Sequence, residues 1–318
     1  MKLSKACIKL IVSYSLYVAI YWSMGLLFLH AQPNQYGITR SLSYKALDSA
    51  HLRIVYSLSY ISDSLKLNEV WEDRKILLIG DSVRHFYSDY QRCSDSATTA
   101  AKGPFRPMTF SGKIKPEGYD MYVFSAEKRR TVFEPVTDLS LYRYQEEIEK
   151  VQWNISSDTG TILSYPCKKA TACFRGREWE VWFTMDIPLD AGPWKLCGLP
   201  GLIMKASDNR EHYVFECIGI ENISKKKQPV ITPQRTYGDF IECTRQEYMK
   251  AQRQFYENYV NSLLAMGYNI SIIDDSGHRM ELIKTPNTKF AERHVMWSMK
   301  VNATDRYKKI PYNPIELE

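Results

Sequence analysis

Short runs of alternating apolar and polar residues, separated by turn residues, recur along most of this chain and constrain its fold more than any other feature. In the run 51–59, Leu52, Ile54, Tyr56 and Leu58 share one face of an extended strand. Similar runs follow at 75–79, 85–90, 119–125, 131–134, 161–174, 179–185, 202–206 and 212–220. Successive hairpins of this kind build an antiparallel meander that curls over its own core. The sequence therefore predicts a mainly β fold, a curled antiparallel meander sheet.

One segment near the C-terminus has helical periodicity instead. Thr244 and Glu247 form a capping box, and Gly267 is a stop signal. Between these signals, side chains recur at helical spacing at Tyr248, Gln252, Phe255, Tyr259 and Leu263. We expect one amphipathic helix over 244–266 that packs against the sheet. The two prolines within 228–236 favour a linker in front of it.

The first 31 residues are typical of a secretory signal. Three lysines precede a mostly apolar run over 10–29, and Ala31 stands at the expected cleavage site. Three serines dilute the run, so we expect cleavage before Gln32; the alternative is an uncleaved anchor helix. The predicted location is the periplasm. Contact with a membrane is expected only through the signal segment, if it is uncleaved.

The domain prediction follows from these elements. Residues 1–31 form the signal peptide, and 32–227 form the antiparallel β domain. Residues 228–318 supply the linker, the helix and a C-terminal segment that packs on the same domain. These boundaries leave one large mature domain.

Charge and composition exclude several function classes. The formal net charge of +6 falls to 6 − 3 = +3 once the three lysines of the signal are removed. That excess is too small to indicate nucleic-acid binding, and no basic helix or zinc-finger spacing accompanies it. The histidines are scattered and no HExxH motif occurs. We therefore predict no nucleic-acid partner, no metal site and no cofactor.

Export changes the interpretation of the cysteines. Six follow the signal: Cys93, Cys167, Cys173, Cys197, Cys217 and Cys243. In an oxidising compartment they permit up to three bridges, and we expect one or two. The alternative is that several are buried free thiols. Cys167 and Cys173 would lie about 20 Å apart on one strand, too far to pair with each other.

The densest motif lies between residues 161 and 221. It contains the hexapeptide Gly-Leu-Pro-Gly-Leu-Ile at 198–203, together with Tyr-x-Cys-x-Lys-Ala-Thr at 165–171, Phe-Arg-Gly-Arg at 174–177 and Gly-Pro-Trp-Lys-Leu at 192–196. The chain also ends with Asn-Pro-Ile-Glu-Leu at 313–317. In these residues it resembles the GLPGLI family of exported Bacteroidota proteins. The resemblance implies an exported, strand-rich protein, and it implies location and fold more than activity.

The hexapeptide also has turn chemistry of its own. Pro200 fixes φ near −65°, and Gly201 accepts the positive φ that a type II turn requires. One interpretation is a rigid corner that redirects the chain. The other is a preformed rim that binds a ligand or partner, with arginines as anion donors. The residues of this candidate binding site are Arg175, Arg177, Trp194, Gly198, Leu199, Pro200 and Gly201.

A catalytic motif offers a competing function. A strand ending in Gly80, Asp81 and Ser82 resembles the nucleophile block of GDSL esterases, with Asp275 and His278 as the rest of a triad. Ser82 would be the nucleophile, His278 the base and Asp275 the residue that orients it. That family requires a parallel α/β sheet, which the sequence does not predict. We therefore expect a non-enzymatic binding or envelope-assembly module that acts on an envelope protein or ligand. A secreted GDSL-like serine esterase is the alternative.

Overall fold

The computed structural model describes residues 42–64, 66–93, 112–117, 119–137, 140–225, 228–235, 240–257, 270–273, 279–281, 297–300 and 313–317. The predicted signal segment lies outside the described residues, as do Asp275 and His278. Among the helices that are described, none has the length and apolar character needed to cross a bilayer.

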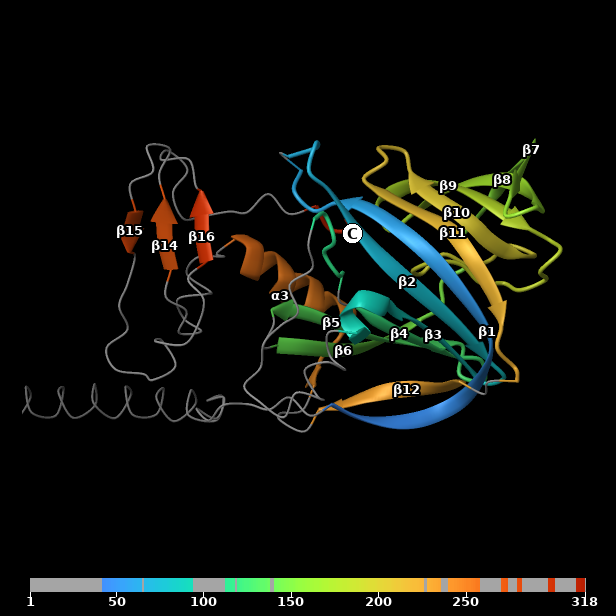
Figure 1. Cartoon of the computed structure of the whole chain (residues 1–318), viewed down its shortest axis with the longest axis horizontal. Helices are drawn as coiled ribbons and strands as arrows, with labels where there is room; N and C mark the ends of the chain where they lie inside the picture. Colours follow the sequence, from blue (N-terminus) through green and yellow to red (C-terminus); the bar gives the residue numbers. More distant parts are fainter. Residues whose placement is uncertain are drawn as a thin grey trace, which may run out of the picture. The chain divides into compact units, whose positions relative to one another are not determined.

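Most of the described chain forms one large sheet (Figure 1). Its strands are β1 (Leu42–Ile61), β2 (Val70–Gly80), β3 (Val83–Ser88), β4 (Asp120–Phe124), β5 (Arg129–Thr137), β6 (Ser140–Glu147), β7 (Asn154–Ile162), β8 (Tyr165–Phe174), β9 (Arg177–Thr184), β10 (Leu202–Asp208), β11 (Tyr213–Asn222), β12 (Gln228–Arg235) and β13 (Ile241–Glu242). Their order is β13-β6-β5-β4-β3-β2-β1-β11-β10-β9-β8-β7, and β12 pairs with the first half of β1. All of these pairings are antiparallel except the short one between β13 and β6. The predicted mainly β, antiparallel fold is confirmed.

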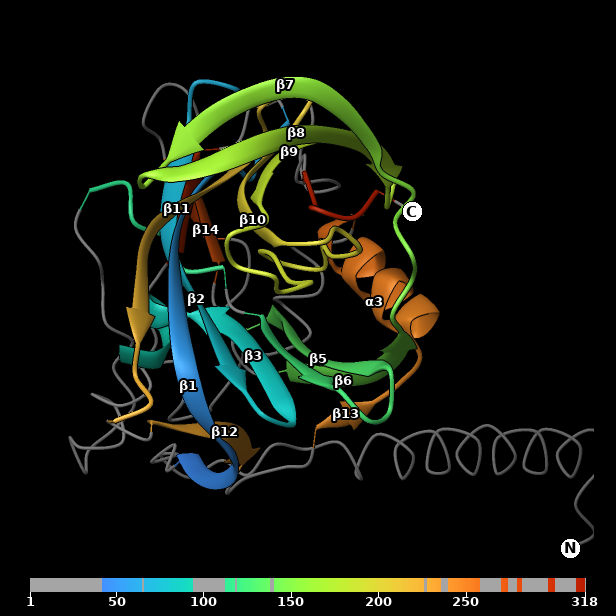
Figure 2. The ribbon, with the colours of Figure 1, turned by 90° about the vertical axis from the view of Figure 1, so that its right-hand side faces the viewer.

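The sheet curls, and one helix lies at its open side. Figure 2 shows the strands curving from β7 and β8 through β1 to β5 and β6, with α3 (Arg245–Glu257) across from the middle of the sheet. The helix contacts β5 and β6, where the ring of Tyr248 stacks on Tyr144 at 5.4 Å between centroids. The predicted capping box is confirmed, because the Thr244 N–H donates to Glu247 Oε2 at 2.7 Å and the Glu247 N–H donates to Thr244 Oγ1 at 3.2 Å.

Both faces of the sheet are covered near β2. Leu77 and Ile79 pack into the larger core cluster, inside the curl, whereas Ile76 and Leu78 pack into a second cluster. Successive side chains of a strand point to opposite faces. A strand buried on both faces is therefore continuously apolar, which is how the sequence of β2 reads over these four residues.

Two sequence predictions about connections are wrong. Residues 161–174 are not one strand: β7 and β8 form a hairpin through Leu163 and Ser164, which both have positive φ. The side chains of β7 are mostly polar and exposed, so its sequence does not alternate between apolar and polar residues. Residues 228–235 are not a linker but strand β12, which pairs with β1. Its prolines lack a backbone N–H. They are tolerated because β12 is an edge strand, which forms backbone hydrogen bonds with a neighbouring strand on one side only.

The expectation of one or two disulfides is also wrong. All six cysteines of the described chain are free thiols. Cys167 and Cys217 are buried, and burial raises the pKa of the Cys217 thiol to about 11. These thiols behave as small apolar side chains in the core, which was the alternative interpretation.

Three short strands form a separate small sheet. They are β14 (Ile270–Ile273), β15 (Arg279–Glu281) and β16 (Trp297–Lys300), in the order β15-β14-β16. The pairing of β14 with β16 is parallel, which differs from the antiparallel arrangement that the sequence predicts.

Candidate functional site

The first four residues of the hexapeptide end the loop between β9 and β10, and its last two begin β10. Its two glycines have different roles. Gly198 has a φ of +100° and donates its N–H to the Asp190 carboxylate. The prediction of positive φ at Gly201 is wrong, because the residues of this loop with positive φ are Trp194 and Gly198. Gly201 is instead required by close packing: a Cβ there would lie 2.0 Å from the Thr184 carbonyl oxygen. Pro200 between them is exposed.

The same loop sends large apolar side chains into the core. Trp194 is 4% exposed and packs against Trp179 and Phe174, with ring centroids 5.5 and 5.7 Å away. Leu199 is buried in the same core cluster, and so are Leu202 and Ile203 at the start of β10. These contacts favour the interpretation of the loop as a structural corner.

The two candidate arginines are paired inside the molecule. Arg177 is buried and donates from Nη1 to Asp208 Oδ2 at 2.7 Å. Its Nη2 donates to Asn313 Oδ1 at 2.8 Å. Arg175 donates from Nη2 to Glu146 Oε2 at 3.2 Å and lies 3.1 Å from Glu149 Oε1. Neither guanidinium is a solvated charge at a hairpin tip, because each is occupied by carboxylates and amides of this chain.

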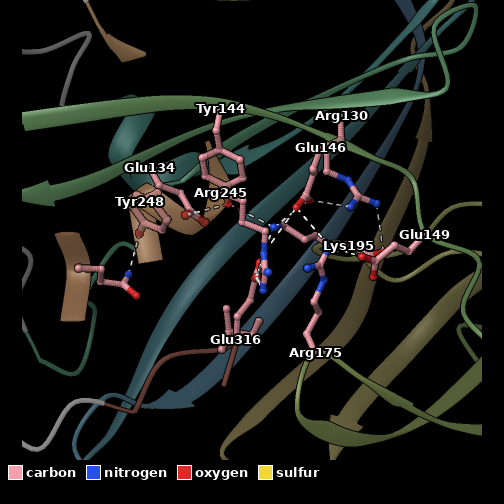
Figure 3. Close-up of polar contacts among 12 residues, drawn as sticks. Arg130, Glu134, Tyr144, Glu146, Glu149, Arg175, Lys195, Arg245, Tyr248 and Glu316 are labelled. Carbon is pink, nitrogen blue, oxygen red and sulfur yellow. Dashed lines mark hydrogen bonds and ion pairs between the residues drawn. The ribbon is translucent and has the colours of Figure 1, made fainter. Parts of the chain in front are cut away.

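Arg175 belongs to a buried ion cluster that the sequence analysis missed (Figure 3). Its members are Arg130, Glu134, Tyr144, Glu146, Arg175, Lys195, Arg245 and Glu316. Glu146 is central, with Lys195 Nζ at 2.8 Å, Arg130 Nη1 at 3.0 Å and Arg245 Nε at 3.8 Å from its carboxylate. Burial opposes ionisation of Glu146, but the neighbouring cations outweigh it and hold its pKa below the ordinary value.

A signal for this cluster existed in the sequence. Lys195 lies in the Gly-Pro-Trp-Lys-Leu motif and Glu316 in the closing Asn-Pro-Ile-Glu-Leu motif, each flanked by apolar residues. The structure brings these two residues into contact and buries both. A charged residue inside an apolar motif is a candidate for a buried pair, but spacing alone could not identify its partner.

A pocket opens beside the ion cluster, with a volume of about 210 Å³. We call it the tyrosine pocket, because Tyr60, Tyr119, Tyr213 and Tyr248 line it. Polar lining comes from Ser62, Lys115, Glu117, Glu134, Gln252 and Glu316, and the remainder from Pro116, Pro135, Val136, Met249, Pro314 and Ile315. The pocket therefore lies among the core of the sheet, helix α3 and the C-terminal residues. None of its lining residues belongs to the predicted loop site.

Two carboxyl groups of the pocket have altered acidity. Burial raises the pKa of Glu117 to about 7, although Lys75 partly opposes this. Burial likewise raises the pKa of Glu134 to about 7 against the effect of Lys195. Within the described residues, Glu117 Oε2 and Tyr119 OH have no hydrogen-bond partner. Near neutral pH both carboxyl groups are present in protonated and ionised forms, so each offers hydrogen-bond donors as well as acceptors.

We predict a pH-dependent effect of Glu117→Gln. The folded-state pKa of about 7 exceeds the ordinary value of 4.5, so folding favours the protonated form. The stabilising contribution of Glu117 is therefore complete below about pH 4.5 and is lost as the pH rises through 7. Glutamine cannot ionise, so the free energy of unfolding of the variant should rise relative to wild type between pH 5 and pH 8. Urea denaturation at both values measures this, and a pH-independent difference would contradict it.

The structure gives no support to the esterase alternative. Ser82 lies in the turn between β2 and β3, which pair antiparallel and not in a parallel α/β sheet. Asp48 holds this turn, because its Oδ2 accepts the N–H of Ser82 at 2.7 Å and of Val83 at 3.0 Å. A Cβ at Gly80 would lie 2.5 Å from the same oxygen. The Gly-Asp-Ser sequence is thus accounted for by a turn packed against Asp48.

The described residues contain no group of three or more histidine, cysteine, aspartate or glutamate side chains arranged to hold a metal ion.

Comparison with known proteins identifies one family model and several solved structures. The model for the PNGase F-II N-terminal region, described as "N-glycanase peptide, N-terminal domain", matches residues 129–241, less than half of the chain. Two structures of PNGF-II, in different crystal forms, are 16% identical to this chain, with TM-scores of 0.43 and 0.42. They match over 64% of this chain, which spans only about a third of their length (34% and 33%). No curated protein matches the sequence.

Proposed function

We propose that this protein is an exported, non-enzymatic binding module of the cell envelope, located in the periplasm, and that its tyrosine pocket binds a single sugar residue. The lysine-then-apolar N-terminus supports export. The motifs shared with the GLPGLI family support assignment to that exported family. Its partner is then an envelope ligand, and no catalytic step is required of the pocket.

The chemistry of the tyrosine pocket is the observation that carries this proposal. Tyrosine rings supply apolar faces, and their hydroxyl groups supply polar edges. Glu117 and Glu134 offer both donors and acceptors near neutral pH, and Gln252 adds an amide. A sugar ring has apolar faces and hydroxyl groups that both donate and accept, so it complements this lining.

Pocket size and the family match restrict the ligand further. Pockets for drug-sized ligands measure about 300–1,000 Å³, and this one is smaller at about 210 Å³. We therefore expect it to take one ring of a glycan. The matching family model is named for an N-glycanase, and its matched range includes Glu134. That match supports the choice of glycans, and of N-acetylglucosamine as the first probe.

The test is saturation-transfer NMR on the purified protein with N-acetylglucosamine, its short oligomers, glucose and mannose. We expect signal transfer to at least one sugar, and we expect the sugar to be recovered chemically unchanged. Gln252→Ala should weaken the binding about tenfold, equivalent to one or two lost hydrogen bonds.

Arg253→Ala is the matched control, since Arg253 is exposed on the same helix and does not line the pocket. It should bind as wild type does. Absence of transfer to every sugar at millimolar concentration would overturn the proposal, as would equal affinity of wild type and Gln252→Ala. Cleavage of an oligomer would replace the non-enzymatic assignment.

A further inference from the structure

Residues 313–317, which we call the C-terminal segment, are bound to the sheet in the manner of a peptide ligand. The Asn313 N–H donates to Ser62 O at 3.0 Å, and Asn313 Nδ2 donates to Ile61 O at 2.7 Å. Asn313 Oδ1 accepts from Arg177 Nη2 at 2.8 Å. The side chain of Asn313 therefore uses both its donor and its acceptor, so the site selects asparagine at this position.

Side chains of the sheet also bind the main chain of the segment. Tyr213 OH donates to Asn313 O at 2.8 Å, and Arg177 Nε donates to Ile315 O at 2.9 Å. The Arg177 guanidinium also donates to Pro314 O. Three consecutive carbonyl groups are thus held by side chains, without the segment joining the sheet as a strand.

Glu316 provides the charged anchor. Its carboxylate contacts Lys195 Nζ, and Arg245 donates to it from Nε at 2.8 Å and from Nη2 at 2.6 Å. Glu316 is 5% exposed, and Ile315 beside it is buried in the larger core cluster. A buried, paired carboxylate makes the site specific for an acidic residue three positions after asparagine.

Each cation of the site also has a carboxylate partner outside the segment. Arg177 has a second partner in Asp208 at 2.7 Å, and Lys195 has one in Glu146 at 2.8 Å. Arg245 lies 3.8 Å from Glu146 as well. Without the segment, Lys195 and Arg245 would share Glu146 with Arg130, so the empty site has an excess of positive charge that favours binding of an acidic segment.

We infer that this is a peptide-binding site, occupied here by the chain's own C-terminal segment, and that it accepts the same segment from a second copy of this chain. A second copy presents identical residues, so exchange reuses every contact described above and needs no new surface. Tyr213 and residues 314–316 also line the tyrosine pocket. The inference nevertheless does not require sugar binding, because it rests on the contacts of the segment with Arg177, Tyr213, Lys195 and Arg245 and on no ligand in the pocket.

The first experiment uses the full chain carrying Asn313→Ala and Glu316→Ala, with a fluorescein-labelled peptide of residues 311–318 as the probe. We expect saturable binding by anisotropy and a rise in melting temperature with peptide concentration. Wild type should bind the peptide at least tenfold more weakly, because its site is already filled. Adding Arg177→Lys to the double variant should abolish the binding, since lysine cannot reproduce the fork of donors.

Two controls separate recognition from general stabilisation. A peptide with both substitutions should not bind, and the wild-type peptide should not raise the melting temperature of Ile76→Ala, which is destabilised in the other core cluster. If the double variant does not fold, the milder Glu316→Gln variant replaces it. The inference would be overturned if the folded double variant does not bind the peptide. It would also be overturned if the peptide raises the melting temperature of Ile76→Ala as much as that of the double variant.

The second experiment addresses the second copy directly. Light scattering on a concentration series of wild type should detect a dimer that is absent from the Asn313→Ala, Glu316→Ala variant. A wild-type protein that stays monomeric across the series, or a variant that dimerises equally, would exclude exchange between copies.

Discussion

Gly201→Ala is expected to destabilise the folded protein by at least ~3 kcal/mol, a large part of the ~5–15 kcal/mol by which a typical domain is stable. A Cβ at this position would lie 2.0 Å from the Thr184 carbonyl oxygen and 2.7 Å from the Thr184 carbonyl carbon. These are backbone atoms of the adjoining strand β9, and they cannot turn away as a flexible side chain can. The loop would have to separate from β9, with loss of the core contacts around it. Urea denaturation or thermal unfolding measures the effect.

Gly219→Ala is the matched control for this substitution. A Cβ there would meet only Val55, at 3.9 Å, which is ordinary van der Waals contact. We expect a change within about 0.5 kcal/mol at that position. Gly201→Ala with the stability of Gly219→Ala would show that the approach to Thr184 is not fixed in solution.

Lys195→Met is expected to cost about 3–5 kcal/mol, the range for removing one partner of a buried ion pair. The Lys195 side chain is fully buried and contacts both Glu146 and Glu316. Methionine fills similar volume, so the cost arises from two carboxylates that lose a cation. Chemical denaturation of wild type and variant at one pH measures this difference.

The partly exposed pair of Lys169 and Glu180 provides the comparison. The distance from Lys169 Nζ to Glu180 Oε2 is 2.8 Å, equal to that from Lys195 Nζ to Glu146 Oε1, but the two side chains of this pair are 26% and 42% exposed. Lys169→Met should therefore leave the unfolding transition nearly unchanged. Equal effects of the two substitutions would mean that burial does not determine the strength of the ion cluster.

The strands were predictable where alternation and turns agreed. The hairpin from β10 to β11 and the turn at Gly80–Ser82 follow directly from apolar periodicity and turn residues. Strand β7 was not predictable in this way, because its side chains are mostly exposed and polar. Strand β12 contains two prolines, which locally indicate a linker, and only its pairing with β1 reveals its role.

The candidate sites were less predictable than the strands, for a physical reason. The sequence identified Arg175, Arg177 and Trp194 as notable, but a side chain's burial depends on partners far along the chain. Arg177 is bound by residues 31 and 136 positions away. The tyrosine pocket likewise combines residues from distant segments, and no local pattern marks such a convergence.

The position of β1 has a consequence for how the chain reaches its fold. One side of β1 pairs with β2, its neighbour in sequence, but residues 52–60 on the other side pair with β11, at residues 213–222. Contacts so distant in sequence slow folding, because a long stretch of chain must close before they form. Until β11 arrives, β1 presents an unpaired edge that other chains can join. For a chain synthesised from its N-terminus, this edge of β1 stays open to pairing with other chains until residue 222 has left the ribosome.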